Sequence, residues 1–150
     1  DLEEFQEALD LGRRLEREGQ RSRAIDAYEI VASIYRGDLF EDDPYAEWCW
    51  EDRETLREQY LDVLSRLAEL SLDVKLPEKS AALYRRALKL DPLRERSHLG
   101  LMRSLWLAQQ PAEALRCYQA CREVLEQELG IGPGPEVERL VRDIQESART

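Results

Sequence analysis

The sequence predicts an all-α fold in which pairs of helices stack in series. Three observations support this prediction: a pattern that recurs about every 34 residues, apolar side chains at helical spacing, and helix-breaking residues between the apolar segments. In the recurring pattern, a small residue, a tyrosine and a second small residue share one helical stripe. Its copies are Ala24, Tyr28 and Val31; Ser80, Tyr84 and Ala87; and Ala114, Tyr118 and Cys121.

The repeat length indicates the kind of helix pair. Pro77 and Pro111 are separated by the same interval as Tyr84 and Tyr118, and a period of this length is typical of tetratricopeptide repeats. Small side chains let a neighbouring helix approach, and the tyrosine ring fills the space beside them. The interval from Tyr28 to Tyr84 exceeds this period by more than half a repeat, so an additional segment separates the first two units. We predict one domain over residues 1–150, a tetratricopeptide-like right-handed superhelix of about three helix pairs plus a C-terminal capping helix.

Breaker and capping residues set most of the expected helix ends. Gly19 ends the first helix, Ser22 caps the second, and Gly130 is a left-handed C-cap. Prolines at 44, 77 and 111 stand in first turns, whereas Pro92 stops the helix before it. The turns before Pro77 and Pro111 carry Lys75-Leu76 and Gln109-Gln110 in place of the expected glycine turn. We expect helices at about 2–17, 22–35, 45–72, 77–90, 93–108, 111–129 and 136–147.

The charge distribution bears on the class of partner. The net charge is −10, and the segment from Asp38 to Glu58 holds nine acidic residues against two basic ones. Affinity for nucleic acid comes mainly from Lys and Arg that neutralise phosphates, so we expect no direct nucleic-acid binding by these residues. The longest apolar runs have four residues, so no membrane span is expected.

The three cysteines do not form a disulfide pattern. Cys117 and Cys121 lie four residues apart on one helical face, where the backbone holds two sulfur atoms poorly for bridging. Cys121 is expected to fill the core, and Cys49 lies between two tryptophans. Three free thiols favour a reducing compartment, so we expect a cytoplasmic protein. Because the chain begins at Asp1, we expect a fragment or a processed product.

No catalytic constellation is visible. His98 is the single histidine, and its repeat position predicts a packed residue at a helix interface. Cys117, Cys121 and His98 lack the short paired spacings of zinc ligands. The segment Gly130-Ile-Gly-Pro-Gly-Pro135 has neither a preceding strand nor a following Lys-Ser/Thr, so it does not predict a phosphate loop. We expect a non-enzymatic protein without cofactor or metal.

The binding surface is predicted from position in the repeat. In stacked helix pairs, the first helix of each pair lines the concave face. Trp106 is either an exposed anchor for a peptide or helix, or it is covered by the final helix. Of Trp48 and Trp50, two residues apart, we expect Trp48 to be packed and Trp50 more open. The predicted partner-binding residues are Arg13, Glu16, Asp62, Glu69, Arg96, Leu99, Arg103 and Trp106.

Several motifs are not general features of helical repeats. They are Tyr35-Arg-Gly-Asp-Leu-Phe40, Trp48, Arg53-Glu-Thr-Leu-Arg57, Tyr60-Leu61, Leu90-Asp-Pro-Leu-Arg-Glu95 with His98, Ala114-Leu-Arg-Cys-Tyr118, and Glu128-Leu-Gly130 with Pro133. In this order they resemble the bacterial transcriptional activator domain, from about residue 9 to residue 144. The resemblance implies a regulatory role in transcription: dimer formation, contact with the transcription machinery, or relay between domains. It also implies that a separate winged-helix domain contacts DNA.

Two other functions remain open at this point. A general tetratricopeptide scaffold or adaptor would bind peptides without any tie to transcription, but it would not need the motif at Tyr35–Phe40. A small-molecule sensor would need a pocket inside the superhelix. In the leading hypothesis the partners are proteins: a second copy in a homodimer, adjoining domains of the same regulator, or the transcription machinery.

Overall fold

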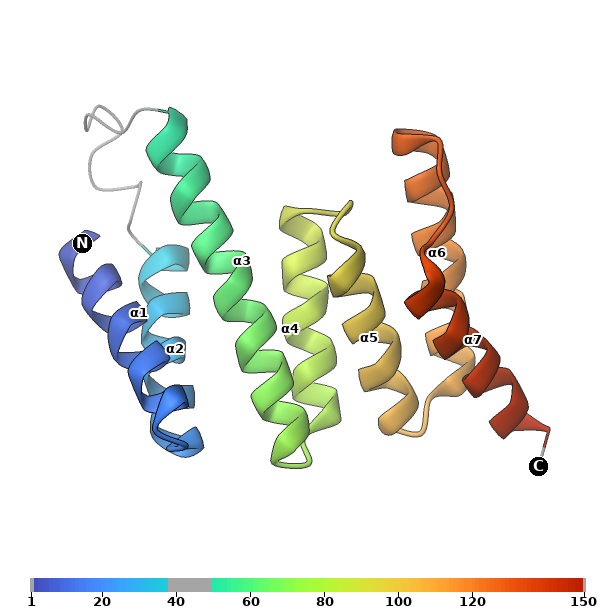
Figure 1. The fold of residues 1–150 in the computed structure, drawn as a ribbon, viewed down its shortest axis with the longest axis horizontal. Helices are drawn as coiled ribbons and strands as arrows, with labels where there is room; N and C mark the ends of the chain where they lie inside the picture. The colour runs from blue at the N-terminus through green and yellow to red at the C-terminus, as the bar shows by residue number, and fades with distance from the viewer. Residues whose placement is uncertain (1, 38–49, 150) are drawn as a thin grey trace. The chain divides into compact units, whose positions relative to one another are not determined.

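The computed structural model describes residues 2–37 and 50–149, which form seven α-helices and contain no strand. The prediction of an all-α fold is confirmed. The chain divides into two compact units, unit 1 (Asp1–Leu70) and unit 2 (Ser71–Thr150), and the division falls inside the third helix. The helices are α1 (Leu2–Arg17), α2 (Arg21–Gly37), α3 (Trp50–Asp73), α4 (Pro77–Leu90), α5 (Glu95–Leu107), α6 (Pro111–Leu129) and α7 (Pro135–Ala148) (Figure 1).

In unit 1, α1 and α2 form an antiparallel pair (Figure 1). The Tyr28 ring of α2 packs so closely on Gly12 of α1 that a Cβ at Gly12 would lie within 3.0 Å of it. Aromatic rings attach α3 to this pair, because Tyr35 of α2 stacks on Tyr60 of α3 with ring centroids 4.1 Å apart. Phe5 of α1 completes the cluster at 6.5 Å from Tyr35. Burial raises the pKa of Tyr35.

Unit 2 repeats the tyrosine–glycine contact. Tyr84 of α4 packs on Gly100 of α5, again within 3.0 Å of where a Cβ would stand. Beside this contact, the buried Ser104 hydroxyl donates to the carbonyl of Gly100 at 2.8 Å and lies 2.9 Å from Ser80 Oγ. α7 then packs on both α5 and α6. It therefore covers the end of unit 2, as predicted for a capping helix, through its buried residues Val137, Leu140, Val141 and Ile144.

The predicted stripe is buried in all three copies with one exception. Its small residues are 0% exposed, from Ala24 and Val31 in the first copy to Ala114 and Cys121 in the third. Tyr118 is only half-buried. Its hydroxyl donates to Glu138 Oε1 of α7 at 2.7 Å. This bond is the first cause of the raised pKa of Tyr118, followed by burial. The exception arises because Tyr118 faces the cap helix and not a further repeat.

The turns after α1, α3 and α5 share one geometry, although only one of them contains glycine. Gly19, Lys75 and Gln109 all have positive φ, at 77°, 66° and 65°. In each turn, this residue and the next donate to carbonyls three and five residues back, as in a Schellman motif. Lys75 and Gln109 therefore adopt the conformation for which a glycine was expected.

Three predictions about helix ends need correction or fall outside the described residues. Ser22 is not the N-cap of α2, since the Gln20 carbonyl accepts the amide of Ala24 and the helix starts at Arg21. α5 starts at Glu95, two residues later than predicted, because Asp91 holds the preceding turn. The predicted start of α3 near Pro44, the burial of Trp48 and the setting of Cys49 lie outside the described residues, as does the Trp50 side chain. Within the described part of the chain, no helix combines the length and hydropathy of a membrane span.

The tyrosine–glycine contacts predict which glycines are indispensable. Gly12→Ala and Gly100→Ala should each lower the free energy of unfolding by about 1–3 kcal/mol, because the added methyl group must displace a buried ring. Gly132→Ala is the matched control, since a Cβ there meets nothing within 4 Å. Urea unfolding followed by circular dichroism would measure all three. Equal losses in all three variants would contradict the packing argument.

The left-handed turn residues predict stabilising substitutions. Lys75→Gly and Gln109→Gly should each raise the free energy of unfolding by about 0.5–1 kcal/mol, because relief of the positive-φ strain exceeds the entropy that glycine adds to the unfolded chain. Thermal unfolding would measure the gain. Gly19→Ala is the converse control and should lose stability. A loss of stability in both glycine variants would show that the side chains of Lys75 and Gln109 outweigh the strain.

Candidate protein-binding face

Four of the eight predicted binding residues lie in unit 1. Arg13 of α1 and Asp62 of α3 are exposed, whereas Glu16 and Glu69 are half-buried. The structure does not bring all four together by direct contact, but it joins Glu16 and Glu69 through Arg66, a residue that sequence reasoning did not select. The i,i+3 spacing of Arg66 and Glu69 pointed to one of these two links.

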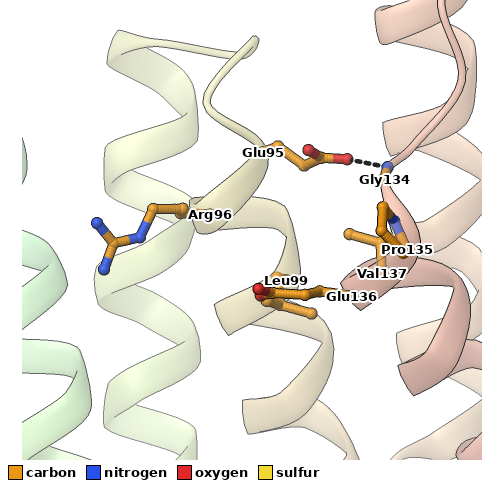
Figure 2. A pocket seen from close by; sticks show the side chains of 7 residues that line it. All are labelled: Glu95, Arg96, Leu99, Gly134, Pro135, Glu136 and Val137. Atoms are coloured by element: carbon orange, nitrogen blue, oxygen red, sulfur yellow. Dashed lines mark hydrogen bonds between the residues drawn. The ribbon is translucent and has the colours of Figure 1, made fainter.

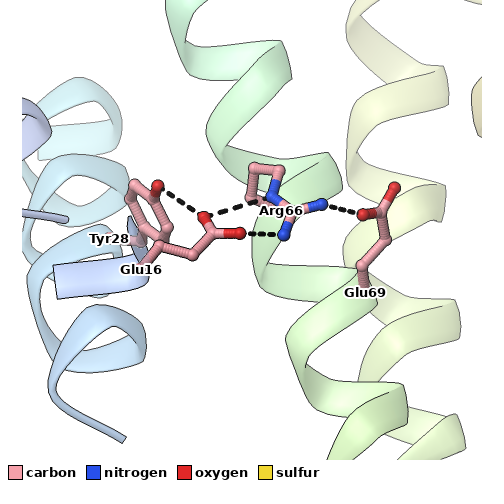
Figure 3. A network of polar contacts seen from close by, with 4 residues as sticks. All are labelled: Glu16, Tyr28, Arg66 and Glu69. Atoms are coloured by element: carbon pink, nitrogen blue, oxygen red, sulfur yellow. Dashed lines mark hydrogen bonds and ion pairs between the residues drawn. The ribbon is translucent and has the colours of Figure 1, made fainter. Parts of the chain in front are cut away.

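Arg66 forms the centre of a polar network in unit 1 (Figure 3). Its Nε donates to Glu16 Oε1 at 3.2 Å, and one terminal nitrogen pairs with Glu16 Oε2 and the other with Glu69. The Tyr28 hydroxyl also donates to Glu16 Oε1, at 2.8 Å. Burial raises the pKa of Tyr28, and the charges of Arg13 and Arg17 lower it by less. This two-point pairing connects α1 to α3 and occupies both carboxylates within the unit.

The other four predicted residues lie on α5 in unit 2. They follow one helical stripe at spacings of three, four and three residues. Arg96 and Arg103 are exposed, Leu99 is 9% exposed, and Trp106 is half-buried. Among the described residues, the structure gives neither arginine an ion pair. The α5 face, defined as Arg96, Leu99, Arg103 and Trp106, therefore presents two uncompensated cations beside apolar surface.

A shallow pocket of about 250 Å³ adjoins the α5 face, where α5 meets the start of α7 (Figure 2). The Glu95 carboxylate accepts the backbone N–H of Gly134 at 2.5 Å and so fastens the start of α7 to α5. Arg96 extends to the opposite side of α5, away from Glu95 (Figure 2). The pocket is lined by Glu95, Arg96, Leu99, Gly134, Pro135, Glu136 and Val137.

The motif Leu90–Glu95 with His98 builds the turn that leads into this site. Asp91 Oδ1 accepts the amide of Leu93 at 3.2 Å. His98 is 7% exposed, and its Nε2 donates to the carbonyl of Pro92 at 2.7 Å. The prediction of a packed histidine is confirmed. His98 therefore supports this turn, because its ring is hydrogen-bonded to the backbone carbonyl of Pro92.

Basic residues outnumber acidic ones on one hairpin of unit 2. The stretch 77–107, which covers α4 and α5, holds seven Lys and Arg against three Asp and Glu, whereas the whole chain holds 22 against 32. A count of charged residues by segment reveals this basic hairpin from the sequence alone. The expectation about nucleic acid therefore rested on the net charge and on the acidic segment 38–58, without the local excess of basic residues at 77–107.

The described residues offer little for chemistry. No three His, Cys, Asp or Glu side chains in residues 2–37 and 50–149 are placed to hold a metal ion. Cys121 is buried, and burial raises its pKa to about 12, so the thiol stays protonated at neutral pH. Cys117 is half-buried, and burial raises its pKa as well.

Paired helices, the small–tyrosine stripe and an exposed face on α5 define a tetratricopeptide-like helical repeat domain. The family model described as bacterial transcriptional activator domain matches residues 1–145. The chain belongs to this family, which confirms the resemblance carried by its motifs. The family is a regulatory domain of transcriptional regulators.

Known proteins similar to this chain agree with that assignment. The regulatory protein AfsR of Streptomyces griseus is 30% identical over 137 residues, which are 87% of this chain and 14% of AfsR. Mycobacterium tuberculosis EmbR, solved in complex with a low-affinity phosphopeptide, has a TM-score of 0.80 at 20% identity, over 96% of this chain and 38% of its own. The chain thus spans well under half of each of these two proteins.

Two eukaryotic repeat domains share the fold. The TPR2B domain of yeast Sti1, in a pHsp70 complex, has a TM-score of 0.66 at 16% identity, over 96% of this chain and 98% of its own. The first tetratricopeptide domain of Spaghetti (RPAP3), bound to the HSP90 peptide SRMEEVD, has a TM-score of 0.65 at 17% identity, over 100% and 97%. At such identities the likeness shows the fold alone.

The Glu95–Gly134 hydrogen bond predicts a local effect on the cap. Glu95→Ala should free the start of α7 and lower the free energy of unfolding by about 1–2 kcal/mol, because a charge-assisted bond to a backbone amide is lost. Hydrogen exchange should rise within 134–148 more than in α4 or α6. Glu136→Ala, at the same pocket, is the matched control and should leave this exchange nearly unchanged. Equal exchange in both variants would contradict the role of Glu95.

Proposed function

We propose that this chain is a non-enzymatic interaction domain of a bacterial transcriptional regulator. It makes contacts with a second copy, with adjoining domains of the same regulator or with the transcription machinery, and a separate domain supplies contact with DNA. The observation that carries the proposal is the α5 face, which exposes two arginines that no other described residue neutralises. The other sides of α5 pack against α4, α6 and α7, whereas the side that carries Arg96 and Arg103 is exposed.

The two units contribute differently to the proposed partner-binding residues. In unit 1, Glu16 and Glu69 are bonded to Arg66, and Arg13 and Asp62 are the two predicted residues that are exposed. In unit 2, the α5 face has its charge available. The three similar structures are complexes with a phosphopeptide, pHsp70 and an HSP90 peptide, which supports a protein or peptide as the partner. Membership of the regulator family favours a transcriptional role over a general scaffold.

Size and charge also argue against the other ligand classes. The pocket beside the α5 face, about 250 Å³, is smaller than the about 300–1,000 Å³ of sites for small ligands, which disfavours a small molecule as the ligand of this face. A net charge of −10 opposes binding of a long polyanion.

Two fusions test the proposal. Joined to a DNA-binding domain that requires dimerisation, the chain should confer repressor function if it self-associates. Joined to a monomeric DNA-binding domain, it should activate a reporter if it contacts the transcription machinery. We expect activity in at least one fusion, and we expect Arg96→Glu/Arg103→Glu to reduce it. Arg142→Glu, an exposed position on α7, is the matched control.

A folded chain that is inert in both fusions would exclude a second copy and the transcription machinery, which leaves adjoining domains as the partner. Fluorescence anisotropy with duplex DNA should show no binding by the chain at physiological ionic strength. Tight DNA binding would contradict the proposal that a separate domain contacts DNA.

A further inference from the structure

We propose that the α5 face is a docking site for an acidic peptide segment that carries one aliphatic side chain and two carboxylates spaced to match Arg96 and Arg103. This inference rests on the proposed function, because it names the chemistry of the partner at the same face. Its basis is the electrostatic contrast within the chain: the α4–α5 hairpin has a surplus of cations in a protein of net charge −10.

The arginine spacing sets the spacing of the carboxylates. Arg96 and Arg103 are seven residues apart on one helix, which corresponds to about 10 Å along the axis at about 1.5 Å per residue. An acidic helix with carboxylates seven residues apart matches this distance, as does an extended segment with carboxylates three residues apart at about 3.3 Å per residue. Each guanidinium can bind a carboxylate through two parallel N–H donors.

The pocket determines where the aliphatic side chain goes. Leu99, Pro135 and Val137 give it apolar walls, and its volume of about 250 Å³ is suited to one side chain. Glu95 and Glu136 also line it, so a carboxylate at this point would be repelled. The acidic groups of the peptide therefore lie along the arginine side of α5, where Arg96 extends away from Glu95 (Figure 2).

A short peptide fits the charge distribution better than nucleic acid does. At physiological ionic strength, exposed charges farther away than about 8 Å are largely screened. A peptide confined to the α5 face is therefore affected mainly by the nearby charges, which are the two arginines and the carboxylates of Glu95 and Glu136 at the pocket. Duplex DNA carries a charge about every 1.7 Å and extends beyond this face, so the net charge of −10 opposes its binding more than that of a short peptide.

The test is fluorescence anisotropy with a labelled helical peptide that carries two glutamates about seven residues apart with a leucine between them. Its twin with glutamine in place of both glutamates is the peptide control. We expect saturable binding of the first peptide that weakens as salt is raised, and much weaker binding of the twin. Arg96→Glu/Arg103→Glu should raise Kd at least about tenfold, because two attractions become repulsions. Arg142→Glu should change Kd less than about twofold.

Three results would count against the inference. Absence of saturable binding up to about 1 mM would overturn it, and so would binding that the double variant leaves unchanged. If duplex DNA bound more tightly than the peptide and lost affinity in the double variant, the face would belong to nucleic acid. Activity in the fusions together with no peptide binding would refute this inference and leave the proposed function standing. Unchanged thermal unfolding of the double variant would confirm that the surface alone was altered.

Discussion

The close approach of a tyrosine ring to a glycine is the contact on which the helix pairs depend. Tyr28 on Gly12 and Tyr84 on Gly100 bring the helix axes as near as a backbone without Cβ permits. The small residues at the ends of each stripe extend the contact along the helices. Because protein interiors are close-packed, the contact of Tyr84 with Gly100 also determines which side chains of α5 are buried. The exposed α5 face is what remains after the tyrosine contact has set the rotation of the helix.

Much of the fold follows from local chemistry and could be predicted. α4 and α6 begin at the prolines that the sequence marks, and α6 ends at Gly130 in the left-handed conformation. The conformation of Lys75 and Gln109 was missed because residue type was taken as the guide to a turn. The hydrogen bonds of the Schellman motif impose the positive φ even where a side chain makes it costly.

The site was harder to predict, because its links join distant parts of the chain. Glu16 and Arg66 are 50 residues apart, and Glu95 and Gly134 are 39 apart. Repeat position selected Arg96 and Arg103, which are exposed in the structure, but it could not show that Glu16 and Glu69 are paired with Arg66. Periodicity identifies a face, whereas only tertiary packing decides which charges on that face are already neutralised.

This distinction bears on how an acidic domain can select acidic partners. Where a carboxylate and an arginine pair within the protein, as Glu16 and Arg66 do, neither adds much to recognition from outside. Where the fold leaves arginines without ion pairs, as at Arg96 and Arg103, a partner can supply the missing charge. The net negative charge of the chain then disfavours long polyanions by repulsion, which is specificity through unfavourable contacts. A basic face of limited length in an acidic protein therefore favours a short acidic segment over a nucleic acid.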